Sequence, residues 1–143
     1  AASAYPIMRI EEMYFIWAEA EAHLDAAKGK EDLIEVMTTI LKRNPEYAFS
    51  GTTTEEVVNE IVKQKRIELF GEGQTFFDIK RLNKGIIRSY ANSNHFDGDK
   101  WNTTKVPDWM TLCIVGSEAD VNHALVNNPT PIAPTENSEE YVW

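Results

Sequence analysis

The sequence predicts an all-α protein in which helix pairs pack as in tetratricopeptide repeats, followed by a long irregular C-terminal segment. Apolar residues recur at three- and four-residue steps through the first 82 positions, which is the period of amphipathic helices. Four of the six prolines fall in the last 37 residues, where Asn, Ser, Thr and Asp are also frequent. We therefore expect a helical core over residues 1–85 and a loop-rich wrap over residues 86–143.

The first helix is expected from about Ile7 to Ala27, with Gly29 ending it in a left-handed cap. One stripe of this helix carries larger apolar side chains, which we assign to the core. Its members are Ile10, Met13, Tyr14, Trp17, Ala20 and Leu24. A second stripe carries only small side chains, at Ala18, Ala22 and Ala26. Because both sides can pack closely, the helix is predicted to be central.

The remaining helices have clearer start and stop signals. They are expected at about Glu31–Lys42, from Thr52–Glu56 to Phe70, at Thr75–Leu82 and near Asp120–Val126. Two overlapping capping boxes, Thr52 with Glu55 and Thr53 with Glu56, mark the start of the third helix. The second helix is stopped by Asn44-Pro45 and the third by two glycines, at positions 71 and 73.

Composition excludes several classes of function. The chain has 143 residues, enough for one core, and a formal net charge of -9, which disfavours nucleic acid as a partner. A single cysteine, Cys113, allows neither an intrachain disulfide nor a cysteine-based zinc site. The three histidines have no metal-ligand spacing, and no apolar run approaches the roughly 20 residues that a membrane helix needs. We predict no metal site and no cofactor.

Charged residues share helix faces with apolar residues between Lys65 and Leu82. On a helix, Arg66 lies in line with Leu69, and Glu68 continues the stripe of Ile61. A charge on a buried face needs a partner, so we predict a structural ion-pair network that is largely buried or half-buried. Its predicted members are Arg9, Glu12, Glu19, Arg66, Glu68, Glu72, Asp78 and Arg81. A solvated helix face is the alternative. Comparable numbers of arginines and carboxylates argue against catalysis.

The same segment resembles the C-terminal region of the SusD/RagB family, the surface nutrient-binding lipoproteins of Bacteroidota. The family pattern is an Arg, Glu-Leu, Glu-Gly, an Arg, Asp-Leu and a further Arg. It is matched by Arg66, Glu68-Leu69, Glu72-Gly73, Asp78-Ile79 and Arg81. Further matches are Arg9, Glu12 and Ala18-Glu19-Ala20 in the first helix, and Ile114, Glu118, Asn122 and Asn128-Pro129 near the end. The sequence departs from the pattern at Lys65, Thr75 and Val115, where Glu, Arg and Pro are usual.

This resemblance implies a non-catalytic protein that captures glycans or other nutrients for import through a SusC-like TonB-dependent outer-membrane transporter. It implies a position on the extracellular face of the outer membrane, with a lipid anchor in a segment outside this sequence. It also implies that residues 1–143 are the C-terminal portion of a longer protein, whose missing N-terminal part covers an apolar face of the first helix. The alternative is a helical protein–protein interaction scaffold without a small-molecule ligand.

Aromatic residues of the irregular region are the candidate ligand-binding residues, because flat rings stack on sugars: Tyr90, Trp101 and Trp109. The alternative is that these rings cover the flank of the helices. Asp97-Gly98-Asp99 carries oxygen ligands suited to calcium but lacks the rest of a site, so a plain turn is expected. Asp97, Asp99 and Glu118 do not have the spacing of glycosidase carboxylates, and we predict no enzyme.

Overall fold

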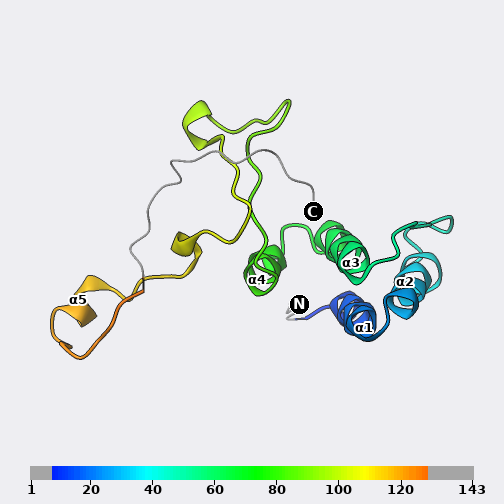
Figure 1. The fold of residues 1–143 in the computed structure, drawn as a ribbon, viewed down its shortest axis with the longest axis horizontal. Coiled ribbons are helices and arrows are strands. Elements are labelled where there is room, and N and C mark those ends of the chain that lie inside the picture. Colours follow the sequence, from blue (N-terminus) through cyan, green and yellow to red (C-terminus); the bar gives the residue numbers. More distant parts are fainter. Residues whose placement is uncertain (1–7, 129–143) are drawn as a thin grey trace, which may run out of the picture. The chain divides into compact units, whose positions relative to one another are not determined.

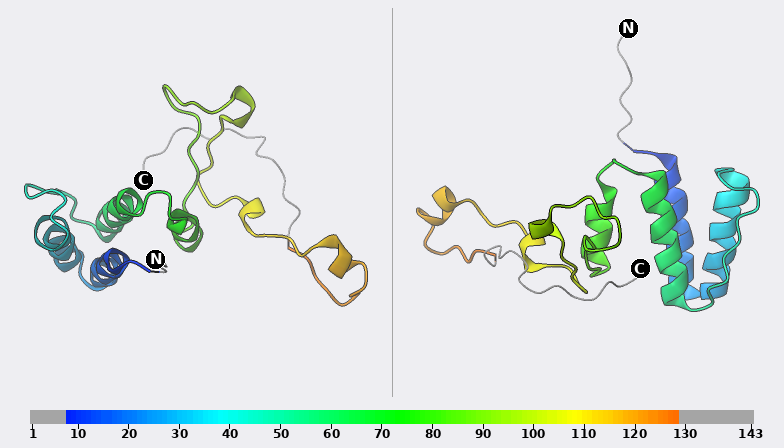
Figure 2. Two further views of the ribbon diagram at one scale, coloured as in Figure 1. Left: turned by 180° about the vertical axis from the view of Figure 1, so that it is seen from behind. Right: turned by 90° about the horizontal axis from the view of Figure 1, so that it is seen from above.

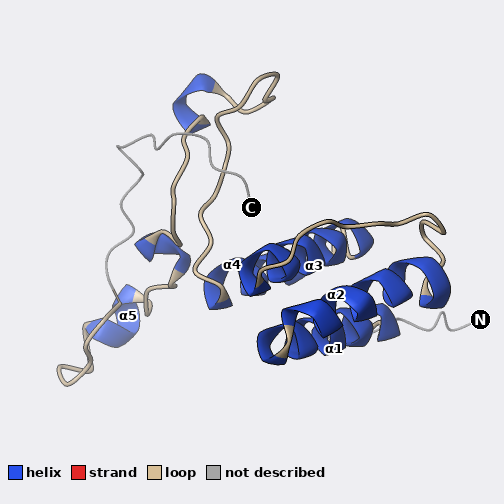
Figure 3. Cartoon of the chain, turned by 45° about the vertical axis from the view of Figure 1, so that its right-hand side comes forward, coloured by secondary structure: helices blue, strands red, loops and turns tan. Residues whose placement is uncertain are grey.

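The computed structural model describes residues 8–128, which are helices and loops without a strand (Figures 1 and 3). The expected all-α class is confirmed. The chain divides into two compact units, with the boundary between Gln74 and Thr75, and each unit is described by itself. Within the described residues, no helix combines the length and the apolar character needed to cross a membrane.

The first unit is built from three helices that lie side by side (Figure 2). They are α1 (Ile10–Leu24), α2 (Ala26–Glu35), which continues into the π-helical turn η1 (Val36–Ile40), and α3 (Thr54–Glu68). Helix α1 contacts both α2 and α3. The core between them is formed by fully buried apolar side chains, among them Phe15, Ala18, Ala22, Leu33, Val36, Val57, Ile61 and Val62.

The turn between the first two helices comes earlier than the sequence analysis expected. Asp25 breaks the helix with φ -150° and ψ 110°, and its side chain accepts hydrogen bonds from the backbone N–H groups of Ala27 and Lys28. Asp25 is therefore the N-cap of α2. Gly29 does not cap the first helix but lies inside α2, where a Cβ atom would sit 2.4 Å from the Cα of Ala22. The glycine lets the two antiparallel helices approach closely.

The larger apolar stripe of α1 was wrongly assigned to the core. Ile10 is 62% exposed, Leu24 is 85% exposed, and Trp17, expected to be buried, is 38% exposed. The helix packs instead through Phe15 and the small side chains Ala18 and Ala22, because only small residues permit the close contact at Gly29. We call the uncovered side the exposed α1 face, formed by Met8, Ile10, Met13, Ile16, Trp17 and Leu24.

The start of α3 was predicted correctly. Thr53 caps the helix, and its side chain and that of Glu56 form one of the two expected capping boxes. The helix ends at Glu68, two residues short of the expected Phe70. The expected second helix, Glu31–Lys42, was displaced by five residues at its start, because the Asp25 cap had not been recognised.

The second unit contains α4 (Gln74–Arg81), one residue from its expected position, and a long connection with short helical turns. These turns are η2 (Asp97–Asp99), η3 (Asp108–Met110) and α5 (Gly116–Ala119). The short helix expected near Asp120–Val126 is wrong, because the helical turn closes earlier, with Asp120 N–H donating to the carbonyl of Gly116. The chain then turns again between Asn122 and Leu125.

Candidate functional site

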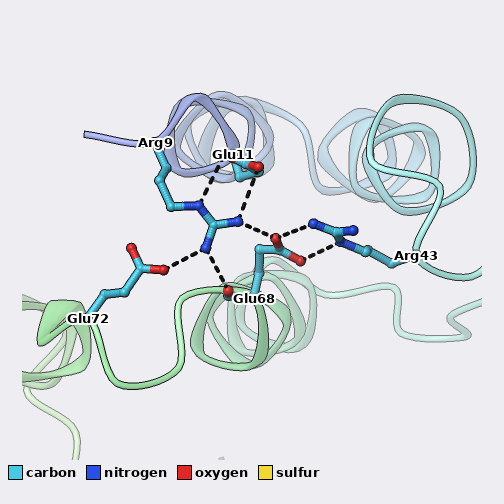
Figure 4. Close-up of polar contacts among 5 residues, drawn as sticks. All are labelled: Arg9, Glu11, Arg43, Glu68 and Glu72. Atoms are coloured by element: carbon cyan, nitrogen blue, oxygen red, sulfur yellow. Dashed lines mark hydrogen bonds and ion pairs between the residues drawn. The ribbon is translucent and has the colours of Figure 1, made fainter. Parts of the chain in front are cut away.

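A cluster of charged side chains joins the ends of the helices in the first unit (Figure 4). The Glu68 carboxylate, at the end of α3, has a side chain that is only 10% exposed. It accepts a hydrogen bond of 2.6 Å from Arg9 Nη2, just before α1. It also accepts bonds of 2.7 and 2.8 Å from Nη2 and Nε of Arg43, just after η1. One carboxylate thus connects three helical elements.

Arg9 spreads its guanidinium over several further acceptors. It contacts the carboxylates of Glu11 and Glu72, and its Nη1 donates to the backbone carbonyl of Glu68 at 3.1 Å. The hydrogen bond to Glu11 and that to Glu72 raise the pKa of Arg9 above its usual value. The bonds from Arg43 and Arg9 hold the pKa of Glu68 below its ordinary range. Arg9 and Glu68 are therefore charged at neutral pH, which suits a structural clamp rather than proton transfer.

Two members of this cluster, Arg43 and Glu11, were not among the sequence candidates. Arg43 reaches Glu68 from the turn that follows the π-helical segment η1, where the Arg43 N–H donates to the Met37 carbonyl at 3.0 Å. The two adjacent cations Lys42-Arg43, directly before the Asn44-Pro45 helix stop, were the available signal. The pairing of Arg43 could not be predicted from this signal, because its partner, Glu68 on α3, lies 25 positions away in the sequence.

The remaining predicted members of the network fall in separate places. Glu12 pairs at 3.3 Å with the buried Lys65, which was not a predicted member, and the buried Glu19 lies 3.8 Å from His23. These four residues belong to the first unit.

In the second unit, the buried carboxylate of Asp78 accepts a hydrogen bond of 2.8 Å from Arg81 Nε.

Arg66, Glu72 and Arg81 are exposed, so the expectation that they are buried or half-buried was wrong. The buried side of α3 is formed by Val58, Ile61, Val62 and Lys65, and position 66 lies beyond its edge.

A closed loop in the second unit presents aromatic side chains. Its base is the isolated bridge between Ile87 and Asn102, where the Arg88 N–H donates to the Trp101 carbonyl at 3.1 Å. The Asn102 side chain, 2% exposed with its residue, accepts from the N–H groups of Arg88 and Ser89 at 2.9 Å each. Its amide also donates to the Ser89 carbonyl at 3.0 Å. Asn102, which sequence reasoning missed, anchors the loop.

The loop rings differ sharply in exposure. Trp101 is only 8% exposed, and the Arg88 guanidinium carbon lies 4.6 Å from its ring centroid. Its indole is therefore covered, and Trp101 is removed from the stacking candidates. Tyr90 is 48% exposed and Phe96, a residue not singled out before, is 85% exposed. The side chain of Trp109 lies outside the described part of the structure.

The Asp97–Asp99 segment forms a turn rather than an open ion site. It is the 3-10 turn η2, and Asp97 pairs with Lys100 at 2.8 Å. That bond lowers the pKa of Asp97. Across residues 8–128, no group of three or more His, Cys, Asp or Glu side chains is placed to hold a metal ion.

Comparison with known protein families assigns the chain to one of them. The model of the SusD family matches residues 1–130. The chain belongs to the SusD family. No curated protein and no solved structure gives a significant match.

SusD-family membership explains the class of function but assigns no residue. The family consists of non-catalytic, helical proteins that bind nutrients such as glycans at the cell surface and work with a TonB-dependent transporter. The Glu68 cluster in this SusD-family chain connects helix ends through ion pairs. The closed loop, with Tyr90 and Phe96 facing solvent, is the better candidate for contact with a ligand.

Proposed function

We propose that this SusD-family chain captures neutral glycans at the extracellular face of the outer membrane and passes them to a SusC-like transporter. Family membership supports the class of ligand and the transporter partner. The proposed binding site rests on one observation: two exposed rings, Tyr90 and Phe96, lie on one loop whose base is held by Asn102.

The physical basis is stacking of an aromatic ring on the apolar face of a pyranose. Burying part of such a ring at about 25 cal/mol per Å² contributes on the order of 1–2 kcal/mol. Two rings on a loop fixed by Asn102 lose little conformational entropy on binding. The expected affinity is modest, with a Kd on the order of 0.1–1 mM.

Calorimetric titration with a panel of neutral oligosaccharides tests the proposal. Phe96→Ala and Tyr90→Ala are each expected to weaken binding about 5- to 30-fold, the equivalent of the lost ring contact. Phe70→Ala is the matched control, because Phe70 is 89% exposed but belongs to the first unit. Unchanged affinity in both loop variants would place the glycan site elsewhere.

A protein-interaction role is the second candidate, and the exposed α1 face favours it. Five large apolar side chains on one helix, from Ile10 to Leu24, are each at least 38% exposed. A contiguous apolar patch of this kind marks a contact surface. It also supports the proposal that residues 1–143 are the C-terminal portion of a longer protein that covers this face. Retained binding of a purified TonB-dependent transporter, with no glycan binding, would favour the interaction role.

A further inference from the structure

A small hollow lies in the first unit, where the segment after Tyr47 leads into α3. It is an open depression with a volume of about 290 Å³, lined by Phe49, Ser50, Gly51, Thr52, Glu56, Asn59 and Glu60. Ligand pockets in proteins begin at about 300 Å³, so this hollow, which we call the Phe49 hollow, has room for one small group. It is separate from the Tyr90–Phe96 loop, which belongs to the second unit.

The aromatic wall of the hollow is held in place by its neighbours. A Cβ atom on Gly51 would lie 2.2 Å from Cζ of Phe49, so only glycine lets the ring fold against this part of the backbone. The Lys30 ammonium lies 5.9 Å from the ring centroid. The ring is half-buried, which leaves part of its surface available.

Besides the aromatic ring, the hollow is lined by polar side chains. Three of them lie on one face of α3: Glu56, Asn59 and Glu60. Glu56 accepts hydrogen bonds of 3.0 Å through Oε2 from the N–H groups of Thr52 and Thr53. These bonds, with Thr53 first, lower the pKa of the Glu56 carboxyl. Its Oε1 atom takes no part in them.

Glu60 is also ionised. Burial alone would raise the pKa of its carboxyl, but hydrogen bonds from Gln64, Tyr47 and Lys63 outweigh that effect and lower it. Between the two carboxylates in sequence, Asn59 has an Oδ1 atom that is shielded from water and has no hydrogen-bond partner among the described residues. A buried amide oxygen without a partner is costly, and rotation of the half-buried Asn59 side chain, which lines the hollow, would let a ligand donor satisfy it.

We propose that the Phe49 hollow binds one neutral, hydroxyl-rich group of about the size of a single sugar ring. The charges of the two carboxylates are balanced by the nearby Lys30 and Lys63 ammonium groups, so the hollow has no net charge that would attract either an anion or a cation. Hydroxyl groups both donate and accept, which suits Glu56, Asn59 and the Ser50 and Thr52 side chains. The Phe49 ring takes the apolar face of the sugar. This site is additional to the proposed loop site and does not depend on it.

Titration of the ¹⁵N-labelled chain, followed by amide chemical shifts, tests the proposal with glucose, galactose and mannose as probes. We expect saturable shifts at Gly51, Thr52 and Asn59 for at least one hexose, with a Kd on the order of 1–10 mM. Glucuronate, which carries a carboxylate in place of the C6 hydroxyl, is expected to bind about tenfold more weakly. Shifts within residues 86–103 report the loop site separately, so failure of one site is distinguishable from failure of the other.

Variants assign the discrimination to particular groups. Asn59→Leu is expected to weaken hexose binding about tenfold with unchanged helical circular dichroism, because one hydrogen bond is lost. Glu60→Gln is expected to reduce the difference in affinity between the hexose and glucuronate. Glu55→Gln is the control: Glu55 is an exposed neighbour outside the hollow, and its substitution is expected to leave that difference unchanged. Absence of saturable shifts for all three hexoses overturns the proposal. Tighter binding of glucosamine than of glucose overturns its preference for a neutral ligand.

Discussion

Replacing Glu68 by Ala removes the carboxylate that connects Arg9, Arg43 and α3, and we expect it to destabilise the protein substantially. The side chain is 10% exposed and accepts three charge-assisted hydrogen bonds of 2.6–2.8 Å. The substitution takes away all three bonds. It also leaves two guanidinium groups near each other without the negative charge between them.

The size of the effect follows from the mixed burial of the partners. Losing one member of a fully buried ion pair costs about 3–5 kcal/mol, whereas exposed pairs contribute about 0–1 kcal/mol. The Arg9 and Arg43 side chains are 28% and 51% exposed, so solvent screens the interaction in part. We therefore expect Glu68→Ala to lower the free energy of unfolding by about 2 kcal/mol, which corresponds to roughly 6–10 °C in Tm for a chain of this size.

Urea titration with circular dichroism measures this change, and Glu55→Ala is the matched control. Glu55 is an exposed carboxylate in the first turn of the same helix, and its loss is expected to change the free energy by about 0.5 kcal/mol or less. Arg43→Ala should also cost less in the Glu68→Ala background than in the parent, because the shared bonds are already gone. Equal effects of Glu68→Ala and Glu55→Ala would refute the reasoning that the cluster clamps the helices.

Four further outcomes are expected. Gly29→Ala should destabilise by about 1–3 kcal/mol through overlap with Ala22, although helix propensity alone favours Ala; thermal unfolding decides the sign. Stability should fall as the pH drops below about 4.5, because the lowered carboxyl pKa of Glu68 provides stabilisation present above its unfolded pKa and lost on protonation. A flat urea-denaturation profile between pH 7 and pH 3 would contradict this. Burial raises the pKa of Asp32, so its ionised form destabilises the fold, in contrast to that of Glu68. Asp32→Asn should therefore raise the Tm at pH 7 and raise it less at pH 3. Glu31→Gln, at an exposed position, should not raise the Tm. Leu24→Glu should reduce binding of a hydrophobic dye to the exposed α1 face, and unchanged fluorescence would contradict the assignment of that face.

Local signals predicted the fold well wherever one element determined its own structure. The Thr53 capping box fixes the start of α3 through bonds between residues three apart, and helix propensity places α4 between two breakers. The turn at Asp25 carried an equally local cap, but Gly29 offered a stronger apparent stop. Its role became visible only from the distance to Ala22 on the neighbouring helix.

Features that depend on tertiary contacts were harder to predict. Two apolar stripes of α1 competed for the core, and periodicity alone does not tell that Ala18 and Ala22 would be buried while Trp17 stayed partly exposed. The candidate site shows the same limit. The sequence showed aromatic residues in the irregular region but not which of them are exposed. Trp101 is covered by Arg88, whereas Phe96 faces solvent, and this difference is visible only in the structure.

The most direct test of the proposed function is a glycan array probed side by side with the parent protein and a Tyr90→Ala/Phe96→Ala double variant. Both rings lie on the loop anchored by Asn102, so their removal is expected to leave the fold intact. The account predicts that the parent binds a subset of neutral glycans and that the double variant loses this signal at the same protein concentration. Equal signals from both proteins, or no neutral glycan bound by the parent, would contradict it.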